Sequence, residues 1–109
     1  METANAVPTI ETITATLFEV IDELNRMLPA GEHLSRDVRT ALMGDSGRLD
    51  SAGLINLIVI AEQRLGERLG KPVLLTDDRT LSRVGEVFGT IGSLAHHVQG
   101  LLSESADVG

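Results

Sequence analysis

The stretch "GDSGRLDS", residues 44–51, contains two Asp-Ser pairs whose serines could do different chemistry. The first pair, Asp45-Ser46, lies between two glycines, a frame that can present a nucleophilic serine. The second pair, Asp50-Ser51, directly precedes a long apolar stretch. A serine in that place can carry an attached group rather than attack a substrate, so the two pairs indicate different proteins.

A catalytic role for Ser46 needs a base, usually histidine, within hydrogen-bond reach, together with an oxyanion hole. The candidate bases are His33, His96 and His97. Adjacent residues on a helix point about 100° apart, so His96 and His97 cannot share a task, and no neighbour fixes either tautomer. The Gly-Asp-Ser-Gly frame is also ordinary turn chemistry. We therefore expect no enzyme and three surface histidines.

Metal binding is not predicted either. The chain has no cysteine, which excludes thiolate ligands, disulfides and a cysteine nucleophile. The histidines lack the i, i+4 spacing that places two ligands on one helix face. The sequence therefore indicates no metal site.

Ser51 follows a residue that is well suited to start a helix. Asp50 is a good N-cap, which places Ser51 in the first helical turn. Free N–H groups and the helix dipole there favour a phosphate, either approaching or covalently attached. Judged by spacing alone, the alternative is that Asp50-Ser51 only caps the helix and carries no attached group.

The segment over residues 10–28 predicts the first helix, because apolar residues recur there at three- and four-residue steps. Thr9 is placed to cap its start, and Pro29 and Gly31 end it. Acidic residues on its other faces are expected to form a solvated surface. The apolar stripe comprises Ile10, Ile13, Leu17, Val20, Ile21, Leu24 and Leu28, and the acids are Glu11, Glu19, Asp22 and Glu23.

A second helix is predicted over residues 51–69, and for two turns apolar residues cover most of its circumference. Ile55 and Val59 fall on a different face from its buried stripe. Such a helix is either central in the fold or touches a partner. The expected buried stripe comprises Leu54, Leu57, Ile58, Ala61 and Leu65.

Residues 29–50 form a long first loop, with a short helical turn expected within residues 35–43. A short helix is expected within residues 77–88, and a last helix over residues 91–102 with Thr90 as its cap. Four apolar residues are expected to anchor the loop, and Met27 and Met43 to fill the core. The anchors are Leu34, Val38, Leu42 and Leu49.

These elements predict an all-α domain, a small four-helix bundle with a long first loop. Aromatic residues make up only 2% of the chain, so the core must be aliphatic, which favours packed helices. The domain is expected to cover residues 9–102, with flexible tails over 1–8 and 103–109.

The net charge of −7 and the isoelectric point of about 4.8 restrict the partners. An acidic chain without a basic cluster argues against nucleic acid and against anionic membrane surfaces. It fits docking onto basic protein patches, or solubility alone. The chain shows no signal peptide and no membrane-spanning run, so a cytoplasmic monomer is expected.

The stretch "LMGDSGRLDSAGLINLIVIAEQRL" and the closing "FGTIGSLAHHV" resemble the acyl carrier proteins, including the peptidyl and aminoacyl carriers. The likeness covers roughly residues 10–102. It implies an acyl-carrier type of four-helix bundle in which Ser51 carries 4′-phosphopantetheine. Asp50 would help to position the metal and cofactor of a phosphopantetheinyl transferase. The arm would hold acyl or aminoacyl groups as thioesters, supplied by a loading ligase and passed to a downstream transferase or ketosynthase.

The second helix departs from the family pattern. Ala52 stands where the family usually has leucine, and Asn56 occupies a position that is often acidic. Glu62 and Glu67 are expected to be balanced by the arginines at 64 and 68. The resemblance then implies a partner-binding face that is more apolar than charged, and a specialised pathway such as polyketide or nonribosomal-peptide synthesis. The alternative is an unmodified carrier-like module used only for protein–protein contact. The partner-binding residues are Ala52, Ile55, Asn56 and Val59.

Overall fold

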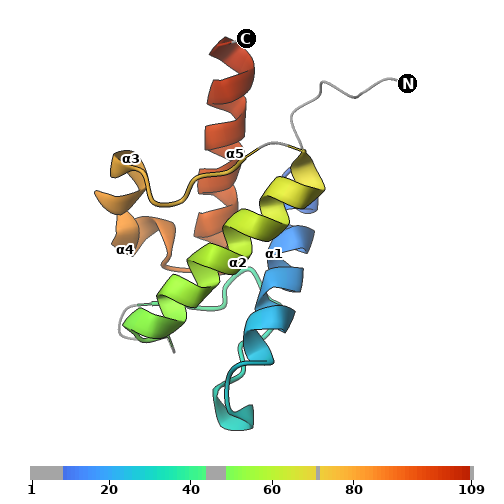
Figure 1. Cartoon of the computed structure of the whole chain (residues 1–109), viewed down its shortest axis with the longest axis vertical. Coiled ribbons are helices and arrows are strands. Elements are labelled where there is room, and N and C mark those ends of the chain that lie inside the picture. The colour runs from blue at the N-terminus through green and yellow to red at the C-terminus, as the bar shows by residue number, and fades with distance from the viewer. Residues whose placement is uncertain (1–8, 44–48, 71, 109) are drawn as a thin grey trace.

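The computed structural model describes residues 9–43, 49–70 and 72–108, and the regular elements in these ranges are all helical (Figure 1). This confirms the all-α class. The short helix expected within residues 77–88 consists of two separate turns. The elements are α1 (Ile10–Asn25), the 3₁₀ turn η1 (Ala30–Glu32), α2 (Ser51–Leu69), α3 (Asp78–Leu81), α4 (Val84–Val87) and α5 (Ile91–Val108).

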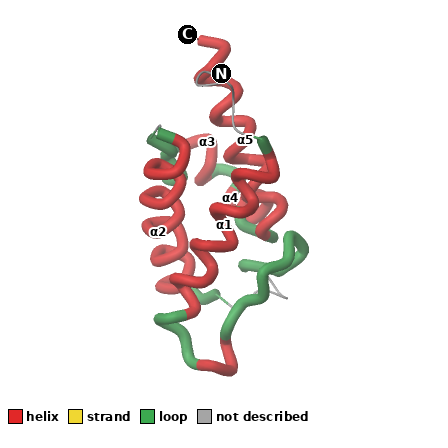
Figure 2. Tube along the Cα trace, turned by 90° about the vertical axis from the view of Figure 1, so that its right-hand side faces the viewer, coloured by secondary structure: helices red, strands yellow, loops and turns green. Residues whose placement is uncertain are grey.

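Helix α1 is the centre of the bundle, because it packs against both α2 and α5 (Figures 1 and 2). Its cap is the predicted one: the Thr9 side chain accepts a hydrogen bond from the Thr12 backbone at 3.2 Å. Leu57 and Ala61 of α2 are buried as expected. The sequence left two interpretations of α2 open, a central helix or one that touches a partner, and in the described residues the extensive packing of α2 is with α1.

The end of α1 differs from the expected one. The helix stops at Asn25 rather than at Leu28, because the Asn25 side chain bonds both backbone groups of Leu34. The Leu34 amide donates to Asn25 Oδ1 at 2.8 Å, and Asn25 Nδ2 donates to the Leu34 carbonyl at 2.9 Å. The chain turns back here, and Met27 is left 54% exposed, so its predicted place in the core is wrong. Met43 does pack against the core.

The first loop is fixed to the start of α5 by backbone hydrogen bonds. The amides of Ile91 and Gly92 donate to the carbonyls of Thr40 and Val38, at 3.1 and 2.8 Å. The short helical turn predicted within residues 35–43 is reduced to one hydrogen-bonded turn, in which the Thr40 amide donates to the Asp37 carbonyl at 2.9 Å. The Val38 and Thr40 carbonyls instead satisfy the first N–H groups of α5. Of the expected anchors, Leu34 and Leu42 are buried and Leu49 is half-buried, but Val38 is exposed.

Helix α5 continues to Val108, past the domain end expected at residue 102, and rises beyond the other helices (Figures 1 and 2). Thr90 caps it as predicted, since its side chain accepts from the Ser93 amide at 3.1 Å. Residues 1–8, expected to be a tail, lie outside the described residues. In the described part of the chain no helix has the length and apolar character needed to cross a bilayer.

Candidate functional site

The start of α2 is built as the sequence predicts. Asp50 has an extended backbone, and its Oδ1 accepts a hydrogen bond from the Gly53 amide at 2.8 Å. The Asp50 carbonyl accepts the first helical bond from the Leu54 amide at 2.9 Å. Ser51 is therefore the first residue of a 19-residue helix, where unpaired N–H groups and the dipole attract negative charge.

Gly53 is a close-packed position in the first turn of α2 that the sequence analysis missed. A Cβ added there would stand 3.1 Å from Leu49 Cδ2 and 3.3 Å from Asp50 Oδ1. The missing side chain therefore lets the capping carboxylate and Leu49 close over the first turn. The signal was present, because glycine is a poor helix former and its place three residues after an N-cap suggests a packing reason.

Two backbone hydrogen bonds connect this site to the rest of the fold. The Leu49 amide donates to the Leu42 carbonyl at 3.2 Å, and the Leu42 amide donates to the Gly89 carbonyl at 2.9 Å. Leu42 itself is fully buried. The residue just before the Asp50 cap is thus held, through Leu42, to the segment that starts α5.

The four predicted partner-binding residues share one exposed face beside Ser51. Their spacing of i, i+3, i+4 and i+7 places them on one side of a helix. Ile55 is 60% exposed and Val59 is 56% exposed, which is unusual for large aliphatic side chains. The face carries no charge, and its residues are Ala52, Ile55, Asn56 and Val59.

Three of the four charged side chains of α2, those of Glu62, Arg64 and Arg68, bond groups outside the helix. Arg64 Nε donates to Glu23 at 3.1 Å, and its Nη1 reaches Glu19 at 3.4 Å. Arg68 donates to Glu19 at 2.6 Å. The hydrogen bond with Glu23 raises the pKa of Arg64. Glu62 accepts from the Leu75 amide at 2.7 Å.

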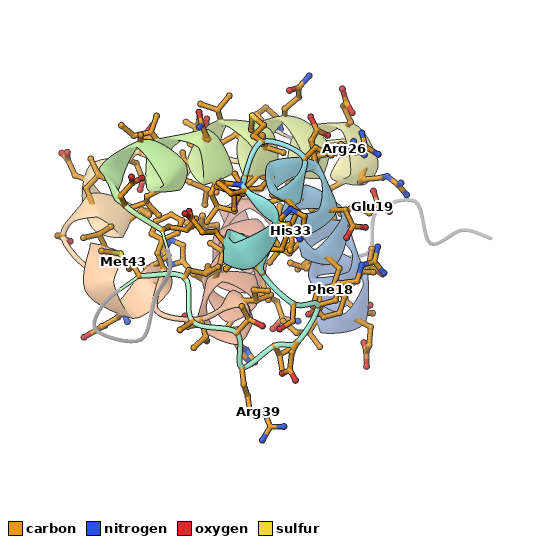
Figure 3. The ribbon with its side chains drawn as sticks, turned by 90° about the horizontal axis from the view of Figure 1, so that it is seen from below. Phe18, Glu19, Arg26, His33, Arg39 and Met43 are labelled. Atoms are coloured by element: carbon orange, nitrogen blue, oxygen red, sulfur yellow. The ribbon has the colours of Figure 1, made fainter. Side chains whose placement is uncertain are left out.

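These contacts correct one expectation. The arginines of α2 equal Glu62 and Glu67 in number, as expected, while their side-chain hydrogen bonds are with α1. The acidic residues of α1 are not simply a solvated face: Glu19, which Figure 3 shows on α1, bonds both arginines. Asp22 of the same helix bonds Arg36 of the first loop, which lowers the pKa of Asp22. The acids of α1 thus hold the second helix and the first loop in place.

The alternative nucleophile and its bases are not assembled into a site by the described residues. Ser46 lies outside them. Figure 3 shows His33 in the first loop, where its Nε2 contacts the Leu28 carbonyl at 3.1 Å. His96 is exposed as expected, but His97 is half-buried and its Nε2 bonds Thr80 Oγ1 at 2.8 Å. The sequence did not reveal this contact between Thr80 and the His97 ring.

Within the described ranges no three carboxylate or imidazole groups come together as a metal site. No protein-family model matches the chain, and no curated protein and no solved structure matches it either. The acyl-carrier likeness therefore rests on the sequence motifs alone.

Proposed function

We propose that this protein is an acyl carrier protein that bears a 4′-phosphopantetheine arm on Ser51. The observation that carries the proposal is the start of α2, where a capping aspartate places Ser51 at the tip of a long helix beside an exposed, uncharged face. The motif resemblance around Asp50-Ser51 and in the last helix supports the same assignment. The protein itself catalyses nothing in this account.

The residues around Ser51 fit such an arm. Asp50 and Ala52, the neighbours of Ser51 in the chain, are both exposed. The helix N-terminus favours the phosphate that would link the arm to the serine. The arm supplies a thiol that carries acyl or aminoacyl groups as thioesters, which a chain without cysteine cannot provide.

We propose two tasks for the Asp50 carboxylate, capping of α2 and contact with the Mg²⁺ of a transferase, and each task can use a different oxygen. Its Oδ1 is occupied by the Gly53 amide, while Oδ2 makes no hydrogen bond within the described part of the chain. An ionised carboxylate has capacity for several partners. Capping and contact with the Mg²⁺ of a phosphopantetheinyl transferase are therefore compatible on one side chain.

The partners would dock on the face formed by Ala52, Ile55, Asn56 and Val59. The first half of α2, residues 51–61, has no charged side chain, so this face offers apolar contact rather than charge. Apolar contact is weakly sensitive to salt, whereas charge steering falls with ionic strength. We assign the protein to a specialised cytoplasmic pathway, polyketide or nonribosomal-peptide synthesis, with its own loading ligase and downstream transferase or ketosynthase.

The test is the intact mass before and after incubation with coenzyme A, Mg²⁺ and a promiscuous phosphopantetheinyl transferase. A gain of one phosphopantetheinyl group is expected for the wild-type chain and for Ser46→Ala, and none for Ser51→Ala. Circular dichroism of each variant shows whether it is folded. No gain in a folded wild-type chain would favour the unmodified interaction module, and loss in Ser46→Ala alone would overturn the choice of serine.

A further inference from the structure

A surface pocket of about 420 Å³ lies between α4 and α5, and none of its lining residues belongs to α2. Its volume is in the range of pockets that hold small molecules. The proposed carrier function makes no use of it. It is lined by Arg83, Glu86, Val87, Ser93, His96 and His97.

Part of the pocket wall is fixed by buried contacts. Val87 is buried, and its carbonyl accepts a hydrogen bond from Ser93 Oγ at 2.9 Å. The same Ser93 oxygen accepts from the Thr90 amide at 3.0 Å. His97 is held by Thr80, whose side chain is fully buried. These contacts fix the part of the pocket wall formed by Val87, Ser93 and His97.

The remaining polar groups are Arg83, Glu86 and His96. Arg83 Nε donates to Glu86 Oε1 at 3.0 Å, and both side chains are exposed. Among the described residues, the two terminal nitrogens of Arg83, the second oxygen of Glu86 and the imidazole of His96 make no hydrogen bond. The pocket thus offers a guanidinium and an imidazole next to one carboxylate oxygen.

This combination matches a particular ligand chemistry. A guanidinium recognises a carboxylate through paired N–H groups. The free oxygen of Glu86 repels a bare anion but accepts a hydrogen bond from a hydroxyl or an ammonium group. We propose that the pocket binds a small carboxylic acid that carries an adjacent hydroxyl or ammonium group, an α-hydroxy or α-amino acid. Arg83 and His96 bind its carboxylate, and Glu86 binds its donor group.

The experiment is a titration of the isotope-labelled, unmodified protein with L-serine, followed by backbone amide chemical shifts. Acetate, which lacks the donor group, and inorganic phosphate are the comparison probes. Saturable shifts confined to α4 and α5 are expected with L-serine, and weaker binding with acetate and phosphate. Equal binding of the three probes, or no saturable shift with L-serine, would contradict the proposal.

Variants test the assigned roles. Arg83→Gln should weaken L-serine binding at least about tenfold, since hydrogen bonds to charged groups are the strong ones. Glu86→Gln should reduce the preference for L-serine over acetate. His96→Gln should also weaken L-serine binding, because His96 is the second group proposed to bind the carboxylate. The matched control is Arg39→Gln, whose side chain is 90% exposed and points away from the protein (Figure 3). An equal loss in the Arg39 variant, or unchanged binding in the Arg83 variant, would overturn the assignment. Because Ser51 is not involved, a negative result leaves the carrier proposal untouched.

Discussion

Replacement of Leu57 by alanine tests the division of α2 into a core face and a docking face. Leu57 is 1% exposed, so its truncation leaves a cavity in the packing between α1 and α2 and should cost about 2–5 kcal/mol. Ile55, two residues earlier, is 60% exposed, and its truncation should cost less than about 1 kcal/mol. The free energy of unfolding of a domain of this size is about 5–15 kcal/mol. The loss expected for Leu57→Ala is therefore a large fraction of the total stability.

The assay is urea unfolding followed by the far-ultraviolet circular dichroism of the helices. Fluorescence lacks a useful probe here, because the chain has no tryptophan or tyrosine. With a typical denaturant slope, Leu57→Ala should lower the midpoint by about 1–3 M urea, and Ile55→Ala by much less. Equal shifts for the two variants, or a negligible shift for Leu57→Ala, would refute the burial pattern. Ile55→Ala should instead slow the loading of the modified protein by its partner enzymes.

Three further outcomes are expected. Asp50→Ala should lose about 0.5–2 kcal/mol of unfolding free energy, because it removes the cap, whereas Asp50→Asn should keep the stability and slow modification by the transferase. Gly100→Ala should stabilise the fold by about 0.5–1 kcal/mol in urea unfolding, since its Cβ meets only open space. Gly92→Ala on the same helix should fall short of that gain, because its Cβ would stand 3.1 Å from the carbonyl oxygen of Val38. The Asp22–Arg36 bond lowers the pKa of Asp22, so this pair stabilises the protein above the ordinary carboxyl pKa and loses that contribution as the pH falls through the lowered value. Asp22→Asn should remove this part of the acid sensitivity in a circular dichroism titration.

Periodicity and capping rules predicted the long helices well. Thr9, Asp50 and Thr90 cap the helices assigned to them, since an N-cap depends on a side chain and a backbone amide only three residues apart. The division of α2 into a buried stripe and an exposed face also followed from spacing alone. Ile60, which is buried, was missed because the helix is apolar on several faces and spacing does not rank them.

The misassigned features all depend on contacts between distant residues. The end of α1 is set by Asn25 bonding the backbone of Leu34, nine residues on. The first loop is shaped by its pairing with residues 89–92. The charges of α1 and α2 looked independent in the sequence, yet Arg64 and Arg68 reach residues more than 40 positions away. Local rules carry no information about such partners.

The most direct test of the central claim is to locate the arm on the chain after modification. Trypsin cleaves after Arg48, which separates the two candidate serines into peptides of residues 40–48 and 49–64. Ser51 is the only hydroxyl side chain in the second peptide. Tandem mass spectrometry should find one phosphopantetheinyl group on residues 49–64, in protein from its own cell as well as after modification in vitro. An arm on residues 40–48, or none on either peptide of a folded protein, would contradict the account.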